Sequence, residues 1–556
     1  MPDAELRRPF RLSLVFLAVL ALLLFLLWWV IGIPIAQGRE RLVAADPAAA
    51  IEAVGSWPRL RLRSEDFEQI LAAAHLMEGN DAEAAEWLRR AARRPPDFFP
   101  ALPREEAGRL FLASGAYDDL LRWYSAVRVR RESPEARLYR AAAELGAGRS
   151  SEARTTFAAV DRRSVDPGRY DALAGAFIHR AEGAFPLVLD REGKTIASWH
   201  VGNADLVALN ADFAPLVDRS GGPLTIEAHL GRIGTAGVIE TTLDPAIQRA
   251  ALAAIAPWRA SLVAIDPRTH EILAVASSPG GGARTNLALE GRYEPGSIIK
   301  ALTALAALET GSIVPKIFPL ECEGFTVIDG RQFFDWARHG RIETNEEAMA
   351  VSCNVAFARM GLALGRERLA EIFARARFGE NADLGLFEVP LGRQVKRVDH
   401  DFMTANYGIG LEVLSVNALH IAMIADMLAS GGTMTTPTLV RVRRSILGEP
   451  IGPPVKPVAN RVAGRDVVAA LLPALEAVVT NVRGTGRRAA ISGVAIAMKT
   501  GTAGDAAGDY DSVVLAFAPA SNPRIALGII AENAGPAELA GAEITRAFLS
   551  AVLTQR

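Results

Sequence analysis

The sequence predicts an α+β protein, in which an antiparallel sheet packed with helices is preceded by an all-α, repeat-like region and one transmembrane helix. Three observations carry this prediction. An uncharged apolar stretch opens the chain, helical patterns fill residues 38–180, and strand patterns at 260–278 and after residue 494 flank long helical patterns. The 556 residues exceed one ordinary domain. Half of the residues are apolar and 22% are charged, which excludes a disordered or collagen-like chain.

The composition excludes several classes of site. With 61 Lys and Arg against 63 Asp and Glu, the net charge of −2 gives no electrostatic case for a nucleic-acid partner. Two cysteines, Cys322 and Cys353, are too few for a disulfide framework or an all-cysteine zinc site, and the eight histidines lack metal-binding spacing. We therefore expect no metal site. The two thiols could pair in an oxidising compartment, but free buried thiols are more common.

Residues 12–36 are predicted to form a membrane anchor within a first segment, 1–37. These 25 residues carry no charge, and a helix rising about 1.5 Å per residue lets them span a ~30 Å hydrocarbon core. A cleaved signal peptide is the alternative, but the run is long and no Ala-x-Ala site follows it. Three arginines precede the run and two follow it, which favours a cytoplasmic N-terminus. A single-pass protein of the cytoplasmic membrane, with its remaining chain on the extracytoplasmic side, is expected.

Residues 38–180 are expected to form a helical region similar to tetratricopeptide repeats. Three stretches look alike, and their central glycines, Gly79, Gly115 and Gly148, lie 36 and 33 residues apart. This period is typical of stacked helical hairpins and resembles the tetratricopeptide repeat, although the full repeat signature is absent. An ordinary helical domain explains the pattern equally well. The region could bind a protein partner, which the sequence does not identify.

Strand patterns begin at residue 181. PLVLDREGKTIAS (186–198) reads as strand, Glu-Gly turn, strand, within a small β-containing linker at 181–235. ASLVAIDPRTHEILAVASS (260–278) predicts a clearer hairpin. Further strands are expected at 494–499, 512–517 and 525–532, followed by a helix near 536–553. Residues 236–556 are therefore predicted to form one domain, a sheet with helices packed on it.

The scarcity of lysine points to candidate catalytic residues. Only six of the 61 basic residues are lysines, and lysine, unlike arginine, can lose its charge at moderate pH. Ser297 opens an apolar-rich helix that Gly311 ends, and Lys300 lies one turn later on the same face. The helix N-terminus favours negative charge on the serine, and a buried lysine could act as its base. A capping serine beside a surface lysine is the alternative.

Two further motifs follow in order. Ser-Cys-Asn at 352–354 offers a hydroxyl that can relay a proton and a carboxamide that can orient an amine and a substrate amide. Taken alone, Ser-x-Asn is usually a turn or cap. Lys-Thr-Gly-Thr at 499–502 offers one cationic and two neutral donors suited to a carboxylate, and its glycine leaves room for a ligand at the backbone.

These three motifs, in this order, resemble the signature of penicillin-binding proteins, the acyl-serine transpeptidases of bacterial cell-wall synthesis. The resemblance covers about 236–535 and includes TTLDPAIQRAA, YGIGLEVLSVNALHIAMIADML and GTG at 484–486. It implies a penicillin-binding/β-lactamase-like fold and a monofunctional, class B-like D,D-transpeptidase, since 38–235 shows no glycosyltransferase pattern. The implied substrates are peptidoglycan stem peptides ending in D-Ala-D-Ala. The resemblance also implies that β-lactams bind, and that no metal or cofactor is needed.

The resemblance also implies a role for each motif residue. Ser297 is expected to be the nucleophile and Lys300 its base. Ser352 would pass the proton toward the leaving D-alanine nitrogen, and Asn354 would hold Lys300 and the substrate amide. Backbone N–H groups of Ser297 and Thr502 would form the oxyanion hole. The residues expected at the substrate's terminal carboxylate are Lys499, also counted as catalytic, Thr500, Gly501 and Thr502.

Two alternatives remain for the activity. The same acyl-serine site could serve a D,D-carboxypeptidase, a β-lactamase or a β-lactam sensor. In a different class, an inactive scaffold could act through the helical region. The motifs favour an active enzyme, because a scaffold does not require both lysines.

Overall fold

A computed structural model describes residues 22, 35–38, 40–42, 46–55, 65–78, 80–91, 104–113, 116–126, 132–181, 184–200, 205–208, 237–278, 286–385, 388–450, 457–504 and 509–554. The chain divides into two compact units, each built from separate stretches of sequence. The first unit comprises Met1–Glu182, Gly234–Val238 and Arg443–Gly452. The second comprises Gly183–Ile233, Ile239–Val442 and Pro453–Arg556.

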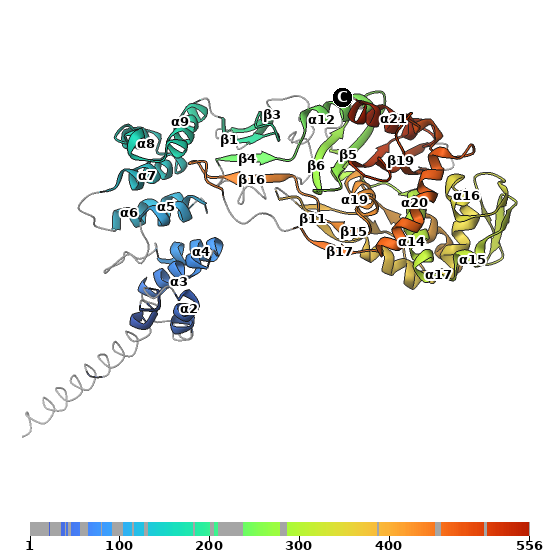
Figure 1. The fold of residues 1–556 in the computed structure, drawn as a ribbon, viewed down its shortest axis with the longest axis horizontal. Helices are drawn as coiled ribbons and strands as arrows, with labels where there is room; N and C mark the ends of the chain where they lie inside the picture. The colour runs from blue at the N-terminus through green and yellow to red at the C-terminus, as the bar shows by residue number, and fades with distance from the viewer. Residues whose placement is uncertain are drawn as a thin grey trace, which may run out of the picture. The chain divides into compact units, whose positions relative to one another are not determined.

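The described residues of the first unit up to Ala181 form helices (Figure 1). Its elements are α2 (Pro47–Gly55), α3 (Glu65–Met77), α4 (Asp81–Ala91), α5 (Arg104–Ala113), α6 (Tyr117–Ala126), α7 (Pro134–Gly146), α8 (Ser150–Ala158), the 3-10 turn η2 (Arg162–Ser164) and α9 (Pro167–Ala181). The pairs α3–α4, α5–α6 and α7–α8 each pack together at the three stretches where the sequence predicts helical hairpins. The all-α region is therefore confirmed, and its likeness to tetratricopeptide repeats stays a prediction.

A distant loop belongs to this helical unit. Tyr139 of α7 is buried and donates to Glu449 Oε1 at 2.7 Å, and Arg169 of α9 pairs with the same carboxylate oxygen at 2.8 Å. Glu449 comes from the stretch 443–452, which lies within the predicted 236–556 domain in the sequence. The two segments are far apart in the sequence, so the sequence alone could not predict that they contact each other.

The predicted anchor at 12–36 lies almost entirely outside the described residues, which include only Leu22, Ile35 and Ala36 of it. Among the helices that the structure describes, none is long and apolar enough to cross a membrane.

A five-stranded antiparallel sheet, ordered β18-β19-β20-β5-β6, forms the core of the second unit. Its strands are β5 (Ala260–Asp266), β6 (Glu271–Ser277), β18 (Ala497–Gly504), β19 (Tyr510–Ala518) and β20 (Ile525–Ala531). The hairpin predicted at 260–278 is confirmed as β5–β6. The strand predicted at 494–499 is displaced, because β18 begins at Ala497 and continues through the whole Lys-Thr-Gly-Thr motif. Pairing with β19 extends the strand through polar residues that an apolar pattern does not include.

Helices cover both faces of this sheet. These are α12 (Pro245–Ile255), α19 (Ala418–Ala429) and α21 (Ala540–Leu553). Gly528 of β20 faces α19 so closely that a Cβ there would overlap Ala418 O and Ala422 N. On the opposite face Val514 of β19 meets Gly541 of α21, and α21 packs against α12. The sheet is thereby buried on both sides, as its apolar strands predict.

The remaining helices and turns of the second unit surround the motif residues. They are α13 (Leu287–Glu290), η5 (Gly296–Ile299), α14 (Lys300–Thr310), α15 (Val314–Ile317), α16 (Asn345–Ala350), α17 (Asn354–Arg375), α18 (Asp401–Ile409), α20 (Arg465–Thr480) and η6 (Arg487–Ala489). α14 packs against α17 and α20, and α17 packs against α18. The first eight residues of α14 are all buried, so this helix lies inside the unit rather than on its surface.

A second five-stranded sheet has the order β16-β4-β1-β2-β3. Its strands are β1 (Ala184–Leu189), β2 (Thr195–His200), β3 (Asp205–Ala208), β4 (Val238–Thr241) and β16 (Val440–Arg444). The hairpin predicted at 186–198 is confirmed as β1–β2.

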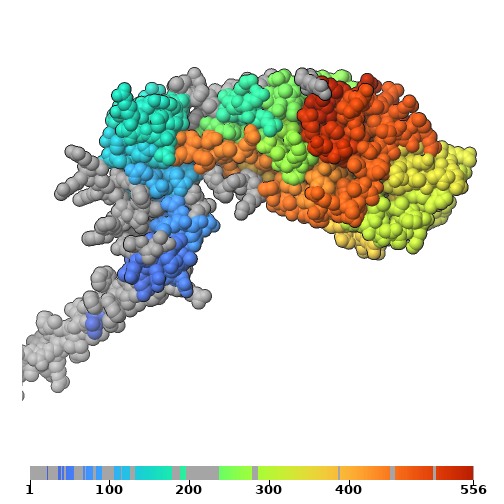
Figure 2. Space-filling model, viewed as in Figure 1, coloured from blue at the N-terminus to red at the C-terminus, as the bar shows by residue number. Residues whose placement is uncertain are grey.

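Short two-stranded ribbons complete the described part of the second unit. They pair β7 (Leu320–Cys322) with β10 (Gly340–Ile342), β8 (Phe325–Ile328) with β9 (Arg331–Phe334), β11 (Asn381–Asp383) with β12 (Glu388–Pro390), β13 (Arg393–Gln394) with β14 (Leu414–Ser415), and β15 (Thr433–Thr435) with β17 (Ala459–Arg461). The yellow segment that carries α15 to α17 gathers at one end of this unit (Figure 2).

Candidate active site

The Ser-x-x-Lys motif lies where η5 runs directly into α14. Ser297 belongs to the 3-10 turn, and Gly311 ends the helix in the left-handed conformation at a φ of 67°. The helix predicted between these residues is therefore confirmed, with a tighter first turn. Ser297 is half-buried, whereas Lys300 is fully buried. The alternative of a surface lysine is wrong.

The Ser297 turn packs against β18, an edge strand of the main sheet. Gly296 has a φ of 53°, and a Cβ on it would lie 2.9 Å from Thr502 O. A Cβ on Gly501 would lie 2.7 Å from Pro295 O. Both positions therefore require glycine for the two backbones to approach. The approach places the Ser297 turn against the Lys-Thr-Gly-Thr stretch of β18.

Lys300 is held by the Ser-x-Asn turn. Its Nζ donates to Ser352 O at 2.7 Å, to Asn354 Oδ1 at 2.6 Å and, at a longer 3.3 Å, to Ser352 Oγ. The ring of Phe357 lies 5.6 Å from the same nitrogen. Burial lowers the pKa of Lys300 to about 8, and the negative charge of Asp335 opposes this shift. A lysine with such a pKa has a neutral amine available near neutral pH.

Ser352 occupies the turn between α16 and α17 in an uncommon backbone conformation. Its φ is 56°, a value that costs about 1–2 kcal/mol for a residue other than glycine. The hydroxyl accepts a hydrogen bond from Lys499 Nζ at 2.8 Å, so both buried lysines contact the same serine. Burial and the neighbouring charge of Lys300 lower the pKa of Lys499.

The hydroxyls of the Lys-Thr-Gly-Thr motif have different partners. Thr500 Oγ1 lies 2.6 Å from Thr485 Oγ1, and the Thr485 backbone N–H donates to Ala350 O at 3.0 Å. Thr502 Oγ1 accepts from the backbone N–H of Ala537 at 3.1 Å, which leaves its hydrogen free to donate. Thr485 was not predicted as a site residue. Its position in the GTG stretch, ahead of the Lys-Thr-Gly-Thr motif, is the sequence feature that could have identified it.

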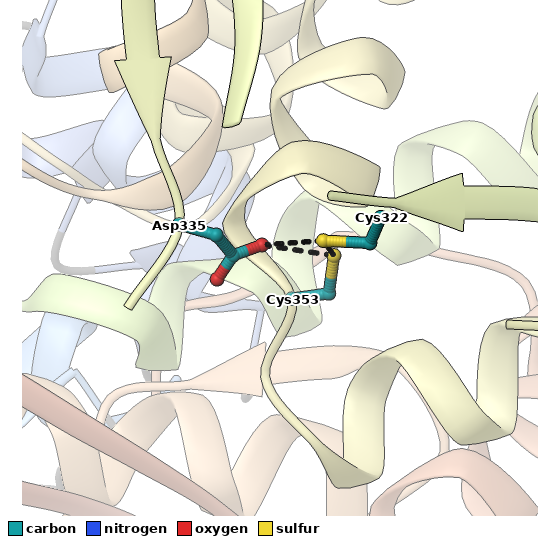
Figure 3. Close-up of side chains that lie close together, drawn as sticks. All are labelled: Cys322, Asp335 and Cys353. Carbon is teal, nitrogen blue, oxygen red and sulfur yellow. Dashed lines mark hydrogen bonds between the residues drawn. The ribbon is translucent and has the colours of Figure 1, made fainter. Parts of the chain in front are cut away.

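Two thiols and a carboxylate gather behind the Ser-x-Asn turn (Figure 3). Cys353 Sγ lies 3.6 Å from Cys322 Sγ and 3.0 Å from Asp335 Oδ2, and Cys322 Sγ lies 3.5 Å from that same oxygen. Both cysteines are free and buried. Burial would raise the pKa of Asp335, but the hydrogen bond with His339 and the charge of Lys300 outweigh it and hold the pKa well below its usual range. Within the described ranges, these three side chains could share one metal ion.

The fold thus brings the three predicted motifs to one place, with Lys300 and Lys499 meeting at Ser352. It also adds Asp335, which no pattern in the sequence singled out. This carboxylate lies between two short ribbons and acts on Lys300 through its charge.

The chain is similar to known proteins of one family. Residues 260–554, more than half of the chain, match the family model of the penicillin binding protein transpeptidase domain. The peptidoglycan D,D-transpeptidase PbpA of Mycolicibacterium smegmatis is 29% identical over 376 residues, which cover 58% of this chain and 74% of that protein. The peptidoglycan D,D-transpeptidase FtsI of Escherichia coli K12 is 27% identical over 312 residues, 53% of this chain and 50% of that protein.

A solved structure shares the fold. The D,D-transpeptidase domain of a peptidoglycan glycosyltransferase from Eggerthella lenta superposes with a TM-score of 0.59 at 24% identity, covering 67% of this chain and 98% of that one. The resemblance found in the motifs is thereby confirmed. The chain belongs to the penicillin-binding protein transpeptidase family, in its group of monofunctional, serine-type D,D-transpeptidases.

Proposed function

We propose that this protein is a membrane-anchored D,D-transpeptidase that cross-links peptidoglycan stem peptides through an acyl-enzyme on Ser297 and binds penicillin covalently at the same serine. The observation that carries the proposal is the meeting of Lys300 and Lys499 at Ser352, next to the Ser297 turn. Relatives named peptidoglycan D,D-transpeptidases support it.

The hydrogen bonds of Lys300 suit a general base. A neutral amine has two N–H groups and one lone pair, and the two short bonds, to Ser352 O and Asn354 Oδ1, use both N–H groups. The lone pair is then available to the hydroxyl of Ser297. As Ser297 Oγ attacks the carbonyl carbon of the penultimate D-alanine, its proton passes to this amine.

The tetrahedral intermediate has to discharge its negative charge and expel D-alanine. The N–H groups of Ser297 and Thr502 would stabilise the oxyanion, because Gly296 lets the two backbones approach. The C–N bond then breaks as Ser352 Oγ donates its proton to the leaving nitrogen. Lys300, which carries the proton taken from Ser297, returns it to Ser352.

The second half of the reaction regenerates the serine. An amine of a second stem peptide attacks the ester carbon, the C–O bond to Ser297 breaks, and the proton of the amine returns to Ser297 through Lys300. The terminal carboxylate of the donor peptide would be held by Lys499, Thr500 and Thr502, with Gly501 allowing close approach. No metal or cofactor takes part in these steps.

The cellular setting of the proposal comes from the sequence. Residues 12–36 would anchor the chain in the cytoplasmic membrane, with the catalytic unit on the extracytoplasmic side, where its substrate lies. The helical unit would then bind a protein partner.

Labelling with a fluorescent penicillin tests the function. Membranes expressing the wild-type chain should show a labelled band at about 59.4 kDa, and Ser297→Ala should abolish it. Ser151→Ala, at an exposed serine of α8, serves as the matched control and should keep the label. An unchanged band in Ser297→Ala would refute the assignment of the nucleophile.

The same assay separates the alternatives. Rapid loss of the label would favour a β-lactamase, and release of D-alanine without an acceptor would favour a carboxypeptidase. A folded wild type that neither takes up label nor hydrolyses a chromogenic cephalosporin would support an inactive scaffold.

A further inference from the structure

Three side chains with metal-binding atoms gather within the stretch 322–353. Cys322 ends β7, Asp335 follows β9 and Cys353 caps α17 (Figure 3). We propose that they form a binding site for one Zn²⁺ or a similar borderline-soft divalent cation. The ligand atoms would be Cys322 Sγ, Asp335 Oδ2 and Cys353 Sγ, with the fourth position left to solvent.

The distances between the donor atoms fit such an ion. Tetrahedral Zn²⁺ with Zn–S near about 2.3 Å and Zn–O near about 2.1 Å places two sulfurs about 3.8 Å apart, and a sulfur and an oxygen about 3.6 Å apart. The two sulfurs here are 3.6 Å apart, and they lie 3.5 and 3.0 Å from Asp335 Oδ2. A disulfide would need the sulfurs to close to about 2.05 Å. The cluster is therefore closer to metal spacing than to a covalent bond.

His339 is placed to orient the carboxylate of Asp335. Its side chain is buried, and its Nε2 lies 3.2 Å from Asp335 Oδ1, on the carboxylate that also reaches the thiols. A histidine that hydrogen-bonds a ligating carboxylate acts as an outer-shell group and fixes the orientation of that ligand. The ring of Trp336 packs edge-on against His339 at 5.1 Å.

Surrounding hydrogen bonds orient the ligands as an outer shell does in metal sites. Backbone N–H groups of Val355 and Trp336 donate to the two oxygens of Asp335, at 3.0 and 2.9 Å. The backbone N–H of Ala356 donates to Cys353 Sγ at 3.3 Å. The antiparallel pairing of Cys322 with Gly340 links the strand of Cys322 to the segment that carries His339. Binding would release two thiol protons to solvent.

The site would steady the catalytic turn. Cys353 lies between Ser352 and Asn354, the two residues that hold Lys300. A metal bound to Cys353 would connect this turn to the ribbon β7–β10. It would thereby stabilise the turn, in which Ser352 has an unfavourable positive φ. The expectation of no metal came from counting cysteines and histidines separately. A mixed set of two Cys and one Asp escapes both counts.

Metal analysis of the full-length protein, extracted in detergent and purified under reducing, chelator-free conditions, tests the proposal. We expect about one zinc per chain in wild type, as in structural zinc sites. Cys322→Ser and Asp335→Asn should lose it, and His339→Ala should weaken binding at least about tenfold. Asp399→Asn, at an exposed aspartate outside the cluster, is the matched control and should retain the zinc.

Cobalt provides a readout that needs no variant. Wild type that has been stripped with a chelator and titrated with Co²⁺ should develop a thiolate-to-cobalt charge-transfer band. This band tests metal binding even if Cys322→Ser fails to fold. The proposal would be overturned if wild type retained no zinc and gave no such band while both of its thiols remained free to react. A Cys322–Cys353 disulfide in freshly extracted protein would overturn it as well. None of these readouts depends on acylation of Ser297, so the proposed function can fail without affecting the result.

Discussion

Lys300 Nζ and the backbone carbonyl oxygen of Ser352 lie 2.7 Å apart in the buried centre of the site. This bond joins the first turn of α14 to the turn between α16 and α17. It depends on the left-handed conformation of Ser352, whose carbonyl and hydroxyl oxygens both lie within hydrogen-bonding distance of the amine. The unfavourable backbone conformation of Ser352 therefore helps to hold Lys300, the proposed base, in position.

Replacing Lys300 should remove most of the acylation rate. General-base catalysis contributes roughly 10²–10⁴-fold, so Lys300→Ala should slow labelling by fluorescent penicillin by a factor in that range. Lys300→Arg should be as poor, because arginine keeps its charge and cannot accept the proton. Lys316→Ala, at an exposed lysine of α15, should label normally. A Lys300→Arg variant with an unchanged labelling rate would rule out the base role.

Two substitutions of Ser352 separate its hydroxyl from its backbone. Ser352→Ala and Ser352→Gly both remove Oγ, and both should slow acylation by roughly 10²-fold or more if the hydroxyl relays the proton. Glycine tolerates a φ of 56°, so Ser352→Gly should be more stable than Ser352→Ala by about 1 kcal/mol. Stopped-flow acylation and urea unfolding measure the two effects. Near-wild-type acylation by Ser352→Gly would mean that only the shape of the turn matters.

The sequence predicts the parts of this fold that local patterns encode. The β5–β6 hairpin, the helix ending at Gly311 and the three helix pairs follow from periodicity and turn residues. The motifs also identified both buried lysines, because their charge on apolar elements is costly unless it is used.

Long-range pairing explains what the sequence could not predict. β18 extends through Lys499 because β19 pairs with it, and Glu449 returns to α7 across 310 positions. Asp335 acts on Lys300 through its charge and Thr485 contacts Thr500, and no spacing rule describes either relationship. The proposed metal site was missed for the same reason, since its ligands meet only after the ribbons have formed.

Gly501→Ala should impair acylation without unfolding the protein. A Cβ there would lie 2.7 Å from Pro295 O and 3.2 Å from Ile298 N, so the Ser297 turn has to move away from β18. A shift of about 1 Å at a reacting group can cost roughly 10²-fold in rate. Gly175→Ala, in α9, has no atom within 4 Å of its added Cβ and should leave labelling unchanged. Equal labelling of the two variants, measured on samples with matched circular dichroism, would contradict the close approach.

The pH dependence of acylation should report the protonation of Lys300. The base must be neutral, and burial lowers its pKa to about 8, so the rate should rise with pH up to about 8 and level off above it. Well below that pH each unit should cost roughly tenfold, because the neutral fraction falls in proportion. Besides burial, Asp335 and Cys353 act on the pKa of Lys300, and both raise it. The neighbouring Lys499 has a pKa that burial and Lys300 lower. Rates of labelling by a penicillin whose own ionisation is constant between about pH 6 and 9 measure the profile.

A flat profile across that range would show that another group takes the proton of Ser297. The lysine would then serve to orient Ser352 and Asn354 as a permanent cation, and the short bonds to their oxygens would be its whole contribution.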